Sequence, residues 1–414
     1  MKQRQALGAV IGRRYQVASR KEKKQMLDEF CQTTGYNRCY ARFVLRLQGQ
    51  RVRIDDSRVL EGDVRQSQTR HKPKIYDAKV AKALVKIWVL LDYLCGKRLV
   101  AILPEIVERL EQFNELRLES ETRTKLLQLS AATADRILKP ERSKYELRGR
   151  SRTRPGTLLK HQIPIRTFSE WNEQRPGFVE LDLVAHDGGL ALGDYMQTLD
   201  MTDVCTGWTE TIAVPNKAQI WVFGAISQAR ERLPFPLRGI DCDNGSEFIN
   251  HELLRYCAAQ HITFTRARPY RKNDNCYVEQ KNYSIVRRTV GYQRFDTGQE
   301  LLVLNQLYAS LRLYTNFFLP TMKLKSKERY GSRIKKSYQD PVTPYRRVLD
   351  SEHVGPGDKE TLLQNYRLLN PAALKRTIDE LQKQLFRLAR TKPKTTITRR
   401  HKQQPLTVNP VISL

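Results

Sequence analysis

The sequence contains no Cys-x-x-Cys pair and no uninterrupted apolar run long enough to cross a membrane. Its seven cysteines are scattered along the chain, and their number is odd. This pattern argues against a disulfide framework or a zinc ribbon and fits a reducing compartment. A membrane span needs about 18 or more apolar residues in succession, and residues 1–15 contain no apolar core of a secretory signal. We therefore expect a cytoplasmic protein with no membrane segment.

One group of potential metal ligands lies around a predicted helix and consists of His251, Cys257 and His261. A structural zinc site needs four ligands, typically at closer spacing. The same helix has an apolar face that runs through Leu253 and Leu254. We therefore interpret this group as packing positions rather than as a zinc site.

Positive charge is abundant but unevenly distributed. The 414 residues have a formal net charge of +29. Residues 1–176 hold 38 lysines and arginines against 20 acidic residues, and residues 321–414 hold 21 against 8. Residues 177–320 are nearly neutral, with 14 against 16. Excess charge of this size favours a polyanionic partner, because neutralised phosphates release counterions. Two basic arms around a neutral middle indicate a nucleic acid rather than general solubility. We expect the partner to be double-stranded DNA in the nucleoid.

A chain of this length exceeds the usual domain size of about 100–200 residues. We predict five regions along it. They are a helix-turn-helix region (1–70), a second helical DNA-binding region (71–138), a basic linker (139–174), an α/β domain (175–320) and a basic C-terminal region with a helix and a disordered tail (321–414).

Residues 19–47 predict a helix, a turn and a second helix. Ser19 and Glu22 have capping-box spacing, and the first helix should end at Gly35. The second helix should begin near Asn37, with Phe43, Val44 and Leu47 facing inward. Its basic residues recur every four positions: Arg38, Arg42 and Arg46. The pattern resembles a helix-turn-helix whose second helix enters the major groove; a plain helical hairpin is the alternative.

The region from Tyr76 to Leu138 also reads as helical. We expect an interruption at Gly96, a restart near Pro104 and a last helix capped by Ser130. The linker that follows loses this periodicity and has alternating arginines at Arg148, Arg150, Arg152 and Arg154. We interpret it as an extended segment that follows a phosphate backbone, or as a solvated loop that becomes ordered on binding.

The middle of the chain alternates strands with helices. Residues 178–184, 195–202 and 209–214 predict three consecutive strands, and strands at 237–242 and 262–266 follow. Helices are predicted at 217–232, with Ile220, Phe223 and Ile226 on one face, and at 251–260, 275–294 and 298–317. This order describes a mixed five-stranded sheet with helices on its faces.

Three carboxylates in this domain are candidate metal ligands: Asp182, Asp243 and Glu279. The first lies within a strand, the second follows one, and the third begins a helix. Competing candidates exist for each position, namely Glu180, Asp187 and Asp200 for the first, Asp241 for the second and Asp274 for the third. Converging carboxylates repel one another unless a divalent cation lies between them. Mg²⁺ or Mn²⁺, as a pair of ions, suits such a sparse set of oxygen ligands and phosphoryl-transfer chemistry.

The residues that carry a family resemblance are Asp182 in a strand, the block Asp243-Asn244-Gly245-Ser246-Glu247-Phe248, and Glu279 after 35 intervening residues. Over about residues 175–300 the chain resembles the catalytic core of the retroviral-integrase superfamily, and particularly the DDE transposases of bacterial insertion sequences. The resemblance implies a ribonuclease H-like fold, metal-dependent cleavage at element ends, and attack of the freed 3′-hydroxyl on target DNA. It also implies a homo-oligomer on DNA.

Further DNA contacts are expected near the glutamate, at Arg271 and Lys272 in the preceding loop and at Lys281, Arg287 and Arg288 beyond it. The C-terminal region is basic, and Asn370-Pro371 should open a helix in which Leu374, Ile378, Leu381, Leu385 and Leu388 form a seam. The seam fits either packing within the subunit or a dimer interface. Two other functions remain open: a DNA-binding regulator with an inert integrase-like domain, and a nuclease for RNA–DNA hybrids.

Overall fold

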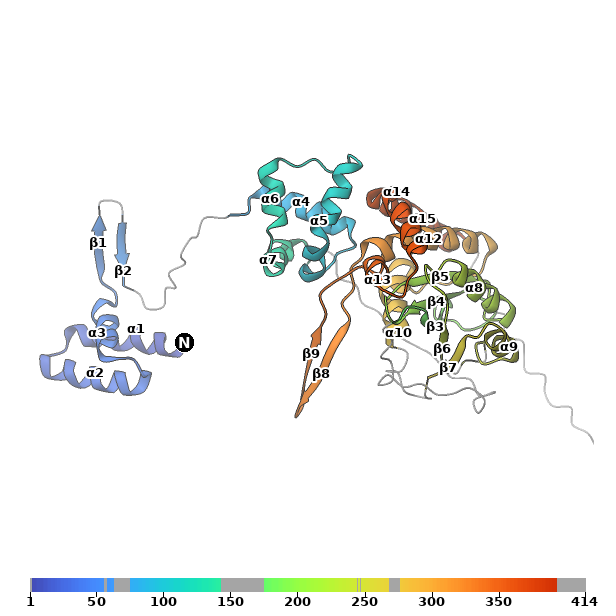
Figure 1. The fold of residues 1–414 in the computed structure, drawn as a ribbon. Helices are drawn as coiled ribbons and strands as arrows, with labels where there is room; N and C mark the ends of the chain where they lie inside the picture. The colour runs from blue at the N-terminus through green and yellow to red at the C-terminus, as the bar shows by residue number, and fades with distance from the viewer. Residues whose placement is uncertain are drawn as a thin grey trace, which may run out of the picture. The chain divides into compact units, whose positions relative to one another are not determined.

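The structure is a computed structural model that describes residues 2–55, 58–62, 75–142, 175–243, 245, 247–267 and 276–392. The chain forms two compact units, residues 1–75 and 76–414. Figure 1 shows their elements along the chain. In the described part of the chain, no helix combines the length and the apolar character that a membrane crossing requires.

The first unit contains three helices and a short hairpin. The helices are α1 (Lys2–Val17), α2 (Arg20–Thr34) and α3 (Arg38–Leu47), and the strands are β1 (Arg51–Asp55) and β2 (Arg58–Glu61). The predicted ends of the second and third helices are confirmed. Ser19 and Glu22 form a capping box, Gly35 ends α2 in the left-handed conformation, and the Asn37 side chain caps α3.

The core of this unit lies between the three helices and includes Leu27, Phe30, Val44 and Leu45. The expectation that Phe43 faces inward was wrong, because its side chain is 60% exposed. The inward face of α3 is filled by Ala41, Val44 and Leu45 instead. Helix α1 and the β1–β2 hairpin were not predicted; α1 is only weakly amphipathic, so periodicity could not reveal it.

The second unit begins with four helices, α4 (Ala78–Leu90), α5 (Gly96–Gln112), α6 (Ser120–Leu127) and α7 (Ala131–Arg142). The predicted cap at Ser130 is confirmed, since its hydroxyl accepts the Thr133 amide hydrogen at 3.2 Å. The expected restart near Pro104 was wrong. Helix α5 begins at Gly96 and runs through Pro104, where burial of the flanking Leu103 and Ile106 outweighs the loss of one main-chain hydrogen bond.

These four helices share one hydrophobic core with the helices at the end of the chain. Arg109 of α5 connects the two groups. Its guanidinium donates to the main-chain oxygens of Tyr366 (2.5 Å), Arg367 (3.0 Å) and Leu369 (2.8 Å). The second helical region is therefore packed onto the rest of this unit.

The sheet of the second unit has five strands in the order β5-β4-β3-β6-β7. They are β3 (Phe178–Ala185), β4 (Gln197–Asp203), β5 (Thr209–Val214), β6 (Gly239–Cys242) and β7 (Thr263–Arg266). Strand β4 is antiparallel to β3 and β5, whereas β6 is parallel to β3 and β7. The predicted mixed sheet of the ribonuclease H-like class is confirmed.

Helices cover the sheet, as Figure 1 shows. Leu181 of β3 and Ile240 of β6 share a core with α8 (Gln219–Glu231) and α9 (His251–Ala259). The predicted apolar face of α8 was partly wrong, because Ile220 is 69% exposed. Cys257 is buried in this core, in agreement with a packing role.

Glu180 and Asp182 of β3 contact the segment that follows β7. This segment comprises α10 (Cys276–Lys281), a π-helix η2 (Asn282–Arg287) and α11 (Arg288–Val290). The long helix α12 (Gly298–Phe318) follows and also packs against the sheet. The single helix predicted at 275–294 is therefore divided by a π-turn, a feature frequent at functional sites.

The C-terminal part contains a hairpin, β8 (Leu324–Tyr330) and β9 (Arg333–Tyr338), and three helices, α13 (Pro344–Asp350), α14 (Pro356–Leu368) and α15 (Pro371–Thr391). Asn370 caps α15, as predicted. Ile378 and Leu385 of its apolar seam are buried in the core of this unit, and α15 packs against α12. Packing within the subunit, one of the two interpretations of the seam, is therefore supported.

Candidate active site

Asp182 lies in the middle of β3, directly opposite Asp200 of β4. Its Oδ1 accepts the Leu183 amide hydrogen at 2.8 Å, and its Oδ2 accepts a hydrogen bond from the Asn282 side-chain amide at 2.6 Å. Burial, together with the negative charges of Asp243 and Glu279, raises the pKa of Asp182 to about 7, although the two hydrogen bonds oppose the shift. The Asp182 carboxyl is thus within electrostatic range of both other candidates.

Asp243 follows the last residue of β6. Cys242, the last residue of β6, pairs with Leu181 in the parallel register. The residue that follows, Asp243, is therefore next in register to Asp182 of β3. The Asp243 Oδ1 accepts the Gly245 amide hydrogen at 2.8 Å. A Cβ atom at position 245 would lie 2.6 Å from the Glu247 carboxyl carbon and 2.9 Å from Asp243 Oδ1, so a larger residue would displace these two carboxylates. Burial raises the pKa of Asp243, as does the nearby Glu247 carboxylate.

Glu279 lies in the first turn of α10 and is exposed. The start of this helix is held by Glu180, whose Oε2 accepts the Val278 amide hydrogen at 2.8 Å. Glu180 is fully buried on β3, and burial raises the pKa of its carboxyl well above the usual value. A buried carboxylate of the sheet thereby occupies the place of a helix cap for the helix that carries Glu279.

The three candidates do not form a closed ligand cluster. Among the residues that the structure describes, no group of three or more His, Cys, Asp and Glu side chains is close enough to hold a metal ion. Their chemistry nevertheless fits a divalent cation. All donors are oxygens, and buried acceptor oxygens of Glu180, Asp200 and Asn282 have no hydrogen-bond partner in the described part.

Burial separates the candidates from most of their competitors. Glu180, Asp200 and Asp241 are fully buried, whereas Asp182 and Asp243 are partly exposed. Asp241 accepts a hydrogen bond from Thr265, and Asp200 accepts one from Thr202. These three acids therefore have structural partners inside the fold. Asp187 caps a turn through Gly189, and Asp274 lies outside the described residues.

The predicted DNA contacts have different environments. Arg38, Arg42 and Arg46 are exposed on α3. The Lys281 ammonium instead donates to the Gly207 main-chain oxygen at 3.1 Å, and burial lowers its pKa. Arg287 donates to the Ala185 oxygen at 2.8 Å. The remaining candidates, Arg148, Arg150, Arg152, Arg154, Arg271 and Lys272, lie outside the described residues.

Sequence reasoning missed two residues of the site, Asn282 and the capping role of Glu180. Asn282 follows Glu279 by three positions, and side chains at this spacing share a helix face. That spacing was a usable signal. The capping role of Glu180 was not readable, because it depends on how α10 approaches β3.

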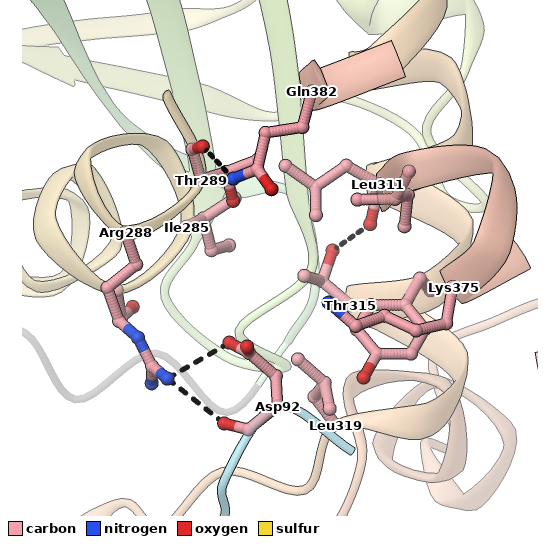
Figure 2. A pocket seen from close by; sticks show the side chains of 12 residues that line it. Asp92, Ile285, Arg288, Thr289, Leu311, Thr315, Leu319, Lys375 and Gln382 are labelled. Carbon is pink, nitrogen blue, oxygen red and sulfur yellow. Dashed lines mark hydrogen bonds and ion pairs between the residues drawn. The ribbon is translucent and has the colours of Figure 1, made fainter. Parts of the chain in front are cut away.

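A pocket lies behind the π-helix, and Figure 2 shows its lining. It encloses about 40 Å³ and is bordered by η2, α12 and α15. Arg288 forms an ion pair with Asp92 at 3.1 Å on its wall. A space of this size holds one or a few water molecules. It is therefore a packing defect at the joint with the α4–α7 helices and not a substrate site.

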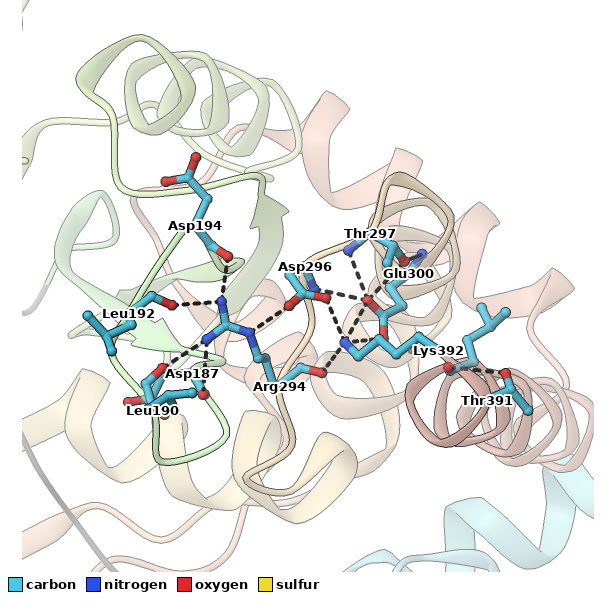
Figure 3. A network of polar contacts seen from close by, with 11 residues as sticks. Asp187, Leu190, Leu192, Asp194, Arg294, Asp296, Thr297, Glu300, Thr391 and Lys392 are labelled. Atoms are coloured by element: carbon cyan, nitrogen blue, oxygen red, sulfur yellow. Dashed lines mark hydrogen bonds and ion pairs between the residues drawn. The ribbon is translucent and has the colours of Figure 1, made fainter. Parts of the chain in front are cut away.

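A polar network fixes the loop between β3 and β4, as seen in Figure 3. The Arg294 guanidinium donates to the main-chain oxygens of Leu190 (2.8 Å), Leu192 (3.0 Å) and Asp194 (2.9 Å). The same residue pairs with Asp296, which also binds Lys392 at the end of α15. The loop beyond the carboxyl end of β3 is thus held by the C-terminal half of the domain.

Known proteins resemble this chain at several levels. An integrase core domain model matches residues 172–272. The uncharacterized protein y4rM of Sinorhizobium fredii (strain NBRC 101917 / NGR234) is 42% identical over 349 residues, which is 84% of this chain and 95% of that protein.

Two retroviral structures are also similar. The catalytic core domain of BIV integrase is 18% identical, with a TM-score of 0.29 over 43% of this chain and 96% of its own. The HTLV-2 integrase catalytic core domain in complex with magnesium is 16% identical, with a TM-score of 0.27 over 36% of this chain and 91% of its own. Given the extended match to y4rM, the integrase core match and the sheet order around Asp182, the chain belongs to the family of y4rM and carries an integrase core domain of the ribonuclease H-like superfamily.

Proposed function

We propose that this protein is a DNA transposase that cleaves the 3′ ends of an insertion element and joins them to target DNA. The observation that carries the proposal is the placement of Asp182. It lies in β3 beside the strand that leads to Asp243, and it accepts a hydrogen bond from Asn282, which follows Glu279 by three positions. Burial and the charges of Asp243 and Glu279 also raise the pKa of Asp182. Buried acids perturbed by neighbouring charges are frequent at functional sites.

In this proposal Asp182, Asp243 and Glu279 bind Mg²⁺ or Mn²⁺, as two ions. Bound metal would activate the attacking oxygen and stabilise the leaving oxygen at phosphorus. The protein's own part is to position the ligands. Asn282 orients the Asp182 carboxyl, the Gly245 amide holds the Asp243 carboxyl, and Glu180 holds the first turn of α10.

The proposed partners are the two element ends and the target duplex, bound by a homo-oligomer in the nucleoid. The net charge of +29 supports a polyanionic partner. In the first unit, the exposed arginines Arg38, Arg42 and Arg46 lie along one helix that follows a three-residue turn after α2. This arrangement supports major-groove contact by α3.

The test uses the full chain and duplexes taken from the ends of the genomic flanks, where inverted repeats should bracket the reading frame. Asp182→Asn, Asp243→Asn and Glu279→Gln should each abolish metal-dependent end cleavage and strand transfer while duplex binding persists. Asp194→Asn and Glu252→Gln serve as matched controls, because both are exposed acidic side chains that are not among the candidate ligands. Full activity of the three site variants would refute the proposal.

A DNA-binding regulator with an inert integrase-like domain is the second candidate. The absence of a closed three-ligand cluster among the described residues favours it. Such a protein would bind the same duplexes, and neither Mg²⁺ nor Mn²⁺ would produce cleavage. Cleavage restricted to RNA–DNA hybrids would identify a nuclease instead.

A further inference from the structure

The β8–β9 hairpin is the most basic described element outside the candidate site. Residues 324–338 contain six lysines and arginines and one acidic residue, Glu328. Figure 1 shows the hairpin as a two-stranded ribbon that projects from its own base in the second unit. A ribbon of two strands gains little stability from its own contacts in water. The exposed ribbon is therefore a candidate binding surface rather than a stabilising element.

The ribbon presents both charged and aromatic side chains. Lys325, Lys335 and Lys336 are exposed, and Tyr330 near the tip is 64% exposed. The Tyr330 hydroxyl donates to Glu328 at 2.6 Å within the ribbon. Among the side chains of residues 324–338 that the structure describes, none forms a hydrogen bond or ion pair with another element. The ribbon is therefore uncovered and strongly positive.

The charge of the ribbon determines which partner fits it. The strand register pairs Glu328, the acidic residue of the ribbon, with Lys335. The excess of positive charge that is left is complementary to a polyanion and not to an apolar or cationic partner.

The base of the ribbon is anchored beside the helix that carries Glu279. Lys323, just before β8, donates to the Cys205 main-chain oxygen at 2.6 Å. Arg347, after the ribbon, donates to the Thr206 oxygen at 3.1 Å. Lys281 of α10 donates to the oxygen of the adjacent Gly207 at 3.1 Å. The ribbon and α10 are thus attached to one turn, between β4 and β5.

We propose that the β8–β9 ribbon binds the phosphate backbone of duplex DNA next to the candidate active site. Seven residues of strand span about 23 Å, and a two-stranded ribbon fits a major groove about 12 Å wide. Lys325, Lys335 and Lys336 contact phosphates, and Tyr330 at the tip contacts sugar or base edges. The inference rests on the proposed function, because it names a surface for the same DNA substrate.

The experiment compares two triple variants of the full chain. K325E/K335E/K336E reverses the ribbon charges, and K217E/R255E/K383E reverses three exposed basic residues elsewhere in the second unit. Both change the net charge equally. Binding to a fluorescent duplex is measured by anisotropy from 0.05 to 0.3 M salt, and circular dichroism checks the fold.

We expect the ribbon variant to lose roughly ten-fold or more in affinity at about 0.1 M salt, with a salt slope smaller by about 2–3, as loss of three phosphate contacts requires. The control variant should keep the slope. Equal losses of duplex affinity in the two variants would overturn the proposal. It would also be overturned if the ribbon variant kept its affinity for the duplex and lost affinity only for single-stranded DNA or for an acidic peptide. Tyr330→Ala should weaken binding without changing the slope.

This readout is independent of catalysis. If the ribbon variant loses duplex binding while Asp182→Asn leaves strand transfer intact, the DNA-binding role of the ribbon is supported and the assignment of the catalytic residues is refuted. If Asp182→Asn abolishes strand transfer while the ribbon variant binds as tightly as the control, the ribbon proposal alone fails.

Discussion

The Asn282 side chain donates a hydrogen bond from Nδ2 to Oδ2 of Asp182 at 2.6 Å, across the interface between the π-helix and β3. Asn282 is the first residue of η2 and lies one turn after Glu279. Its own Oδ1 is buried and has no hydrogen-bond partner among the described residues. The contact connects the two elements that bear the first and third candidate ligands.

Asn282→Ala should lower strand transfer about ten-fold or more, because Asp182 loses the donor that orients its carboxyl. Duplex affinity should not change. The measurement is single-turnover strand transfer at saturating DNA, with the metal concentration varied. Asn282→Gln retains a donor and should restore part of the rate, whereas a purely structural role would lower the thermal stability of both variants alike.

Glu180→Ala should also lower strand transfer, through the helix rather than through the reacting atoms. Removal of the carboxylate leaves the Val278 amide hydrogen without its acceptor and frees the first turn of α10, at a cost of about 1–3 kcal/mol. Glu180→Gln keeps an acceptor oxygen and should retain most of the rate and stability. Hydrogen exchange of the Val278 amide reports the change directly, and unaltered exchange in the alanine variant would contradict the assignment.

Arg109→Ala should destabilise the second unit by about 3 kcal/mol, because three main-chain oxygens around the end of α14 lose a shared charged donor. Arg109 is only 6% exposed, so water replaces the guanidinium poorly. Urea unfolding followed by tryptophan fluorescence measures the change. The exposed Arg117→Ala is the matched control and should shift the transition by less than about 0.5 kcal/mol.

His186 makes the stability depend on pH. Its Nε2 shares a hydrogen bond with the Thr198 hydroxyl at 2.7 Å. Burial, and to a smaller extent Arg287, lowers the His186 pKa from 6.5 to about 3. Between these values the unfolded chain binds a proton that the folded chain does not bind, so the free energy of unfolding decreases as the pH falls.

The slope of that loss is at most about 1.4 kcal/mol per pH unit. His186→Gln should be less stable than the parent protein at pH 7.5, and the difference should shrink by roughly 2–3 kcal/mol at pH 4.5. Urea unfolding at the two pH values measures it. A constant difference would show that His186 does not titrate in this window.

Local patterns determined much of this protein from the sequence alone. The caps at Ser19, Asn37 and Asn370 depend only on neighbouring residues, so their positions were predictable. The alternation in β3 placed Glu180 and Asp182 on one face, because the pleat has a period of two. The order of elements indicated the mixed sheet, because three consecutive strands followed by alternating helices and strands are typical of one.

Tertiary structure decided what depends on contacts between distant segments. Phe43 and Ile220 match an apolar pattern but are exposed, because no element in the described part of the chain covers them. Whether Lys281 meets solvent or the Gly207 oxygen depends on the turn between β4 and β5. The candidate site depends on such contacts as well. Asp243 and Glu279 contribute to the raised pKa of Asp182 through the register of β3 with β6 and the docking of α10 on β3. Sequence spacing alone determines none of these contacts.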